Sequence, residues 1–156
     1  MIKLLLFVFL IINSGLIFAH SDELEGFMTD YCTGYPEGTL ERPQVWKHCC
    51  LEHDLYFWAG GSHEDRKTSD LILKECIAET GEEFQSKLIY WAVTAGSYSP
   101  VKFSNKKWNY GWTDRRSPQR LSREDIERIE YEIRSPEYQE FDPLTIERFL
   151  SVLKNR

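Results

Sequence analysis

Two adjacent cysteines, Cys49 and Cys50, constrain the fold of this chain more than any other feature. The chain has four cysteines, and the other two are Cys32 and Cys76. Neighbouring cysteines are poor partners for each other, so oxidation leaves two pairings: 32–49 with 50–76, or 32–50 with 49–76. In either case one short stretch is fastened both to the segment before it and to the segment after it.

The first nineteen residues have the pattern of a secretory signal peptide. Lys3 gives a positive start, an apolar run extends from Leu4 to Ile12, and the small residue Ala19 precedes His20. The run is shorter than the roughly 20 apolar residues that a membrane-spanning helix needs. We therefore predict a protein that is secreted or periplasmic, where disulfides are the expected state of its cysteines.

Length and composition predict one all-α domain. Residues 20–156 are enough for a single modest core, and apolar residues recur at helical spacing without a convincing strand pattern. A formal net charge of −6 argues against generic nucleic-acid binding, because neutralising phosphates requires an excess of Lys and Arg. We expect two long antiparallel helices and a loop within a core at 20–96. Additional C-terminal helices and a basic, aromatic loop occupy 97–156 of the same domain.

The two central helices are predicted from residues typical of helix ends as well as from the spacing of apolar residues. Pro43 suits a first helical position and Gly60 a C-terminal end, which gives a helix over 43–59. A second helix is expected from Thr68 or Ser69 to about residue 96, with a bend or break at Gly81.

Three other segments complete the predicted organisation. Ser122 and Asp142-Pro143 mark the starts of two C-terminal helices. A short amphipathic helix is expected over 20–30. The irregular segment 97–119 either seats an anionic head group at a membrane interface or closes the edge of the core with its aromatic rings.

A histidine and an aspartate on the two central helices form a candidate catalytic pair. If Cys49 pairs with Cys76, the helices run antiparallel, and His53 and Asp70 lie about 6 and 9 Å from the bridge on the same side. An aspartate that accepts a hydrogen bond from one imidazole nitrogen leaves the other nitrogen free as a general base. We predict that His53 and Asp70 touch and activate a water molecule.

Asp54 is a candidate metal ligand. It points about 100° around the helix from His53, and if Cys32 pairs with Cys50, the loop 31–38 is held beside its carboxylate. Carboxylate and backbone carbonyl oxygens are the ligands that Ca²⁺ prefers. The cation would polarise a substrate carbonyl and stabilise the oxyanion that forms when water attacks.

The stretch Cys-Cys-Leu-Glu-His-Asp at 49–54 resembles the Cys-Cys-x-x-His-Asp active-site helix of secreted phospholipase A2. Tyr31-Cys32 resembles the entry of that family's calcium loop, and Asp70-x5-Cys76 is similar to its second helix. The resemblance covers about a third of the chain. It implies the pairing 32–50 with 49–76, and a Ca²⁺-dependent hydrolase that cleaves the sn-2 ester of phospholipids at a membrane surface.

The resemblance also assigns roles. It implies His53 as base, Asp70 as its partner and Asp54 as the carboxylate ligand, with carbonyl ligands from Tyr31, Thr33 and Tyr35. Two departures stand out: the family's loop continues Gly-x-Gly-Gly where this chain has Thr33 to Gly38, and Phe57 replaces a tyrosine whose hydroxyl contacts the second-helix aspartate. The sequence therefore predicts altered calcium geometry and a dyad with one anchor fewer.

Two other functions remain open at this point. Cys49, Cys50 and His53, with Cys32 or Cys76, are a possible zinc set. Alternatively, the chain is a non-catalytic binding module on the same scaffold, whose altered loop no longer takes calcium. Glu52 is expected to be solvent-exposed in every case.

Overall fold

The computed structural model describes residues 22–98, 107–113 and 116–156. The predicted signal peptide lies outside these ranges, and so does much of the basic and aromatic segment. The described elements are five α-helices and a short 3₁₀ helix: α1 (Lys47–Ala59), α2 (His63–Glu79), α3 (Glu83–Tyr98), α4 (Arg123–Ile133), η1 (Pro136–Tyr138) and α5 (Pro143–Lys154). Over these residues the all-α class is confirmed, and no helix there is long and apolar enough to cross a membrane.

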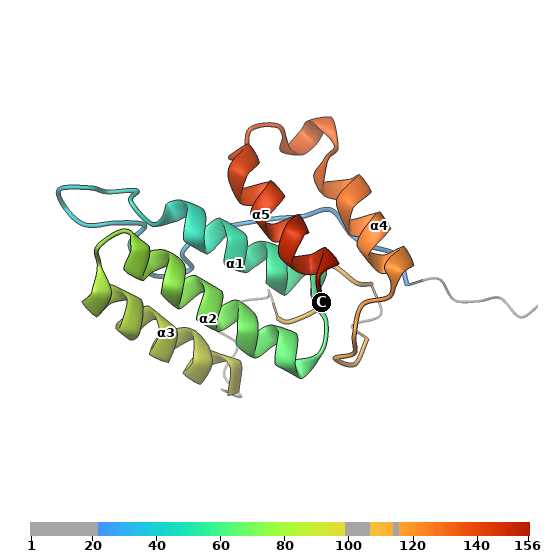
Figure 1. The fold of residues 1–156 in the computed structure, drawn as a ribbon, viewed down its shortest axis with the longest axis horizontal. Coiled ribbons are helices and arrows are strands. Elements are labelled where there is room, and N and C mark those ends of the chain that lie inside the picture. The colour runs from blue at the N-terminus through green and yellow to red at the C-terminus, as the bar shows by residue number, and fades with distance from the viewer. Residues whose placement is uncertain (1–21, 99–106, 114–115) are drawn as a thin grey trace, which may run out of the picture.

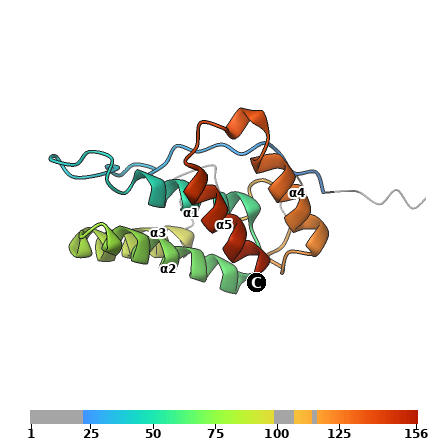
Figure 2. The same ribbon diagram turned by 45° about the horizontal axis from the view of Figure 1, so that its top comes forward.

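The helices form two layers that meet at α1. α1 and α2 lie side by side and antiparallel, α3 packs along the outer side of α2, and α5 crosses α1 with α4 beside it (Figure 1). The turned view shows α2 and α3 together beneath α1 and α5 (Figure 2). Disulfides join Cys32 to Cys50 and Cys49 to Cys76, which is the pairing that the resemblance implied.

Two clusters of buried side chains form the core. One surrounds the disulfides and includes Trp46 of the α1 entry, Leu73 and Ile77 of α2, and Ile89 of α3. The other lies between α1 and the C-terminal helices. Its fully buried members include Leu55, Tyr56, Trp58, Trp112, Ile129, Phe149 and Leu150. The C-terminal helices thus share a core with α1 and belong to the same domain.

α1 begins at Lys47, so the prediction of a start at Pro43 is wrong. The backbone N–H of Trp46 donates to the carbonyl of Glu37 at 3.1 Å, and its indole Nε1–H donates to the carbonyl of Pro36 at 2.7 Å. These bonds to the preceding loop hold residues 43–46 in turns, because the same donor cannot also serve a helical bond.

α2 begins at His63, earlier than the predicted Thr68 or Ser69. Ser62 and Asp65 form a reciprocal capping box, in which each side chain accepts the other's backbone N–H, at 3.2 and 2.8 Å. The predicted break is confirmed: Gly81, at φ 88°, separates α2 from α3. α3 continues to Tyr98, so the proposed division at residue 96 falls inside a helix.

The caps of the C-terminal helices are confirmed. Ser122 accepts the N–H of Asp125 at 3.1 Å to start α4, and Asp142 accepts the N–H of Thr145 at 3.0 Å to start α5.

The short helix predicted over 20–30 is wrong for the described residues 22–30. Glu25 N–H donates to the carbonyl of Gly111 at 2.7 Å, and Leu24 forms an isolated antiparallel bridge with Trp112. Phe27 N–H donates to the Tyr138 hydroxyl at 2.8 Å. Backbone groups that a helix would need are therefore taken by distant segments.

The described part of the aromatic segment closes the end of α1. The indole N–H of Trp112 donates to the carbonyl of Ala59 at 2.8 Å, and that of Trp108 donates to the carbonyl of Gly61 at 2.9 Å. Trp112 is fully buried. Residues 107–113 therefore close the edge of the core, which is one of the two roles expected for this segment. Its basic residues Lys102, Lys106 and Arg115 lie outside the described ranges.

Candidate functional site

His53 and Asp70 meet between α1 and α2. Their closest atoms, Nε2 of His53 and Oδ1 of Asp70, are 2.9 Å apart, and the two side chains are 11% and 3% exposed. Cys49, one turn before His53, carries the disulfide to Cys76 on α2, which fixes the register of the two helices. The predicted contact is confirmed. With the proton on Nε2 facing the carboxylate, Nδ1 carries the lone pair that a base needs.

The second oxygen of Asp70 is held by a residue that the sequence interpretation missed. Arg66 Nη1 lies 3.2 Å from Asp70 Oδ2, four residues earlier on α2, and its side chain is also buried. A carboxylate buried between an imidazole and a guanidinium has both oxygens satisfied. The i,i+4 spacing of Arg66 and Asp70 was the available signal.

Aromatic rings pack beside the dyad. The ring of Phe57 lies 4.6 Å from that of His53, and Trp108 packs edge-on against Phe57 at 5.2 Å. Phe57 therefore supports the imidazole by packing. Arg66, four residues before Asp70 on α2, supplies a polar anchor for the Asp70 carboxylate.

Asp54 lies on the neighbouring side of α1, buried against the N-terminal segment. The Thr29 hydroxyl donates to Asp54 Oδ2 at 2.7 Å and also accepts the N–H of Tyr31 at 2.9 Å. Burial, followed by the charges of Asp54 and Asp30, raises the pKa of Tyr110, whose hydroxyl donates to the carbonyl of Met28 at 2.6 Å. Asp54 is thus joined to the segment that leads into the loop.

The loop itself is closed by its own turns. Tyr31 has a positive φ of 57°, and its carbonyl accepts the N–H of Thr33 at 3.1 Å. The carbonyl of Cys32 accepts the N–H of Tyr35 at 2.9 Å, and the Thr33 hydroxyl donates to Asp30. The Tyr35 hydroxyl reaches Gln85 of α3. Among the carbonyl ligands that the resemblance implied, that of Tyr31 therefore already accepts a hydrogen bond.

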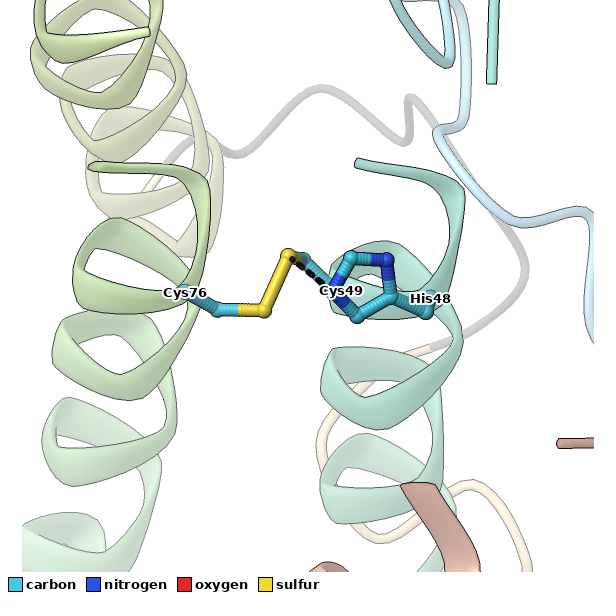
Figure 3. A group of neighbouring side chains, drawn as sticks. All are labelled: His48, Cys49 and Cys76. Carbon is cyan, nitrogen blue, oxygen red and sulfur yellow. Dashed lines mark hydrogen bonds between the residues drawn. A yellow bond between two sulfur atoms is a disulfide. The ribbon is translucent and has the colours of Figure 1, made fainter. Parts of the chain in front are cut away.

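A histidine next to the second disulfide does not form a zinc site. His48 Nε2 lies 3.4 Å from Sγ of Cys49, which is bonded to Cys76 (Figure 3). The zinc set considered from the sequence depends on thiolate ligands, and all four cysteines are in disulfides. The zinc alternative is therefore wrong, because oxidation has removed its ligands.

Glu52 is buried, so the expectation that it is exposed is wrong. Its side chain is 1% exposed, forms an ion pair with Arg148 of α5, and accepts the Tyr56 hydroxyl at 3.2 Å. Burial, and then the charge of Glu52, raises the pKa of Tyr56, so that hydroxyl stays a donor. This cluster fastens α5 to α1 on the side away from α3 (Figure 1).

Comparison with known proteins identifies no relative of this chain. No protein-family model, curated protein or solved structure matches this chain. The site is therefore interpreted from its own residues.

Proposed function

We propose that this protein is a secreted, Ca²⁺-dependent hydrolase of the phospholipase A2 type, which cleaves the sn-2 ester of phospholipids. One observation carries the proposal: the 2.9 Å contact between His53 and Asp70 across two antiparallel helices joined by a disulfide. The spacing of Cys49, Cys50, His53 and Asp54 supports the same activity through the family resemblance.

In the proposed reaction, His53 acts as a general base. Nδ1 takes a proton from a water molecule as that water attacks the ester carbonyl, and Nε2 keeps its proton facing Asp70. Asp70 stabilises the imidazolium that forms, and Arg66 holds Asp70 from its other oxygen. The attack is direct, without a covalent intermediate on the protein. The tetrahedral intermediate then collapses with cleavage of the bond between the carbonyl carbon and the sn-2 oxygen, and the His53 imidazolium returns its proton to the departing alkoxide, which releases a fatty acid and a lysophospholipid.

The donor set near Asp54 fits Ca²⁺ in its chemistry. Asp54 offers a carboxylate and the loop offers the carbonyls of Tyr31, Thr33 and Tyr35, all hard oxygen donors. The disulfide from Cys32 to Cys50 ties that loop to the turn of α1 before Asp54. These residues would hold the cation, which supplies charge stabilisation for the oxyanion when bound.

The test is release of fatty acid from phosphatidylcholine. We expect hydrolysis that requires Ca²⁺, is lost in His53→Gln, and is retained in His63→Gln, a matched control on the exposed start of α2. Equal rates for the wild type and His53→Gln would end the proposal.

A second candidate, a non-catalytic binding module, is favoured by the internal turns of the loop, where the Tyr31 carbonyl is engaged by Thr33. Titration calorimetry with Ca²⁺ separates the two. Heat of binding that disappears in Asp54→Asn supports the hydrolase, whereas no binding up to about millimolar Ca²⁺, the weak end of extracellular sites, supports the module.

A further inference from the structure

The Thr29 hydroxyl joins two of the residues proposed to hold the cation. It donates to Oδ2 of Asp54 at 2.7 Å and accepts the backbone N–H of Tyr31 at 2.9 Å. Asp54 belongs to α1 and Tyr31 to the start of the loop, so one hydroxyl connects the proposed carboxylate ligand with backbone that supplies a proposed carbonyl ligand. Thr29 precedes the residues that carry the family resemblance, and the resemblance gives it no role.

Both ends of this bridge have orientations that need support. Asp54 is only 8% exposed, and the bond to Oδ2 limits rotation of its carboxylate. Tyr31 has a φ of 57°, in the left-handed region that residues other than glycine seldom occupy. A hydroxyl that accepts the N–H two residues later stabilises a local turn. Thr29 therefore orients one proposed ligand by donating a hydrogen bond and another by accepting one.

These bonds are compatible with a bound cation. A carboxylate offers about four acceptor sites and a carbonyl oxygen about two. The bond from Thr29 uses one site of Asp54, and the N–H of Thr33 uses one site of the Tyr31 carbonyl. Thr29 thus orients these groups without taking the place of the cation.

The segment that carries Thr29 is held by the core. The Tyr110 hydroxyl donates to the carbonyl of Met28 at 2.6 Å, and the N–H of the buried Phe27 donates to the Tyr138 hydroxyl at 2.8 Å. The position of the Thr29 hydroxyl is therefore set by contacts with 107–113 and η1 and does not depend on the turns of the loop.

We infer that Thr29 is a positioning residue of the cation site, whose hydroxyl holds the Asp54 carboxylate and the Tyr31 turn in the orientation that receives Ca²⁺. The inference rests on the proposed function, because it states how this chain organises the cation of that function. Hydrogen bonds to metal ligands from residues outside the coordination sphere typically contribute about 10–100-fold to metal affinity. Ligands that are oriented before binding lose less conformational entropy when the cation binds.

Titration calorimetry with Ca²⁺ tests this role. Thr29→Val keeps the shape of the side chain and removes both hydrogen bonds, so its Kd for Ca²⁺ is expected to rise about 10–100-fold. Thr29→Ser keeps the hydroxyl and is expected to bind Ca²⁺ nearly as tightly as the wild type. Circular dichroism checks the fold of each variant, and Thr29→Ala, which removes the same hydroxyl from a partly exposed position, replaces Thr29→Val if that variant does not fold.

Thr145 provides the matched control. Its hydroxyl donates to Oδ2 of Asp142 at 2.7 Å, the same kind of bond at the same distance, at the start of α5. Thr145→Val is expected to lower the Tm and to leave the Kd for Ca²⁺ unchanged. Thr29→Val would behave in the same way if Thr29 only satisfied a buried carboxylate. The rise in Tm that Ca²⁺ produces is a second readout, and it is expected to be smaller in Thr29→Val than in Thr145→Val.

The outcomes separate this inference from the proposed function. Equal Kd values for Thr29→Val and the wild type overturn the positioning role and leave the proposed hydrolase standing. Weaker Ca²⁺ binding by Thr29→Val, together with no fatty-acid release by the wild type, refutes the hydrolase and leaves the positioning role standing. Absence of Ca²⁺ binding by the wild type refutes the cation site and, with it, the role of Thr29.

Discussion

Replacing Arg66 with Met tests whether its guanidinium holds the dyad together. Arg66 Nη1 is 3.2 Å from Asp70 Oδ2, and the two side chains are only 9% and 3% exposed. A hydrogen bond to a charged group contributes roughly 1.5–3 kcal/mol, and here its loss leaves a buried carboxylate short of a donor. We expect Arg66→Met to lower the free energy of unfolding by about 2–3 kcal/mol.

The same change should slow hydrolysis by about 10–100-fold, since 1.4 kcal/mol corresponds to a factor of ten. The loss should appear in kcat rather than KM, because in the proposed reaction Asp70 orients His53 and does not touch the lipid. Arg66→Lys keeps the charge without the planar fork and should recover part of the rate. A rise in KM with kcat unchanged would contradict a positioning role, because it would mean that only substrate binding had weakened.

Arg42 is the matched control for stability. It pairs with Glu82, but the side chains are 50% and 24% exposed, and such surface pairs contribute about 1 kcal/mol or less. Urea unfolding of Arg66→Met, Arg42→Met and the wild type gives the comparison. If Arg66→Met is no more destabilising than Arg42→Met, the buried anchor does not stabilise the protein as argued.

Three further predictions concern the scaffold. Arg148→Met should destabilise the protein by about 3 kcal/mol and Glu52→Leu by only about 1–2, because Glu52 is 1% exposed and Arg148 41%; urea unfolding that reverses this order refutes the burial argument. Asp142→Ala should cost about 1 kcal/mol at neutral pH. Hydrogen bonds from Thr145 lower the pKa of Asp142 below 3.8, so this cost should vanish as the pH falls through the folded-state pKa, as thermal unfolding against pH will show. Removing Cys32 and Cys50 together should cost about 3 kcal/mol in the free energy of unfolding, measured in urea, and should weaken Ca²⁺ binding in calorimetry.

The helix starts show how far sequence alone could predict this fold. Ser122 and Asp142 were identified because a cap is local chemistry, complete within four residues. Ser62 and Asp65 have the same capping-box spacing, but the polar segment around them was predicted to be a loop between the two central helices, so the start of α2 was placed too late. The predicted helix start at Pro43 was wrong for another reason. The backbone N–H of Trp46 donates to the carbonyl of Glu37 in the preceding loop, and no local sequence pattern reveals that contact.

The site divides in the same way. The contact between His53 and Asp70 could be predicted, since one disulfide sets the register of two antiparallel helices and helix geometry then fixes the distances. The burial of Glu52 could not be predicted, because its partner Arg148 lies 96 positions later in the sequence. Arg148 is on α5, and the sequence does not specify how α5 packs against α1. A buried charge is predictable only when its partner is.

The adjacent cysteines explain how the proposed base and the proposed cation ligand are positioned independently. Cys49 and Cys50 differ by about 100° around α1, so one disulfide fastens α2 and the other fastens the loop. His53 and Asp54 repeat that difference one turn later, so each faces the element fastened before it: His53 faces α2 at Asp70, and Asp54 faces the segment leading into the loop. Separate covalent bonds therefore set the two halves of the proposed chemistry, and the loop can change its turns without moving the dyad.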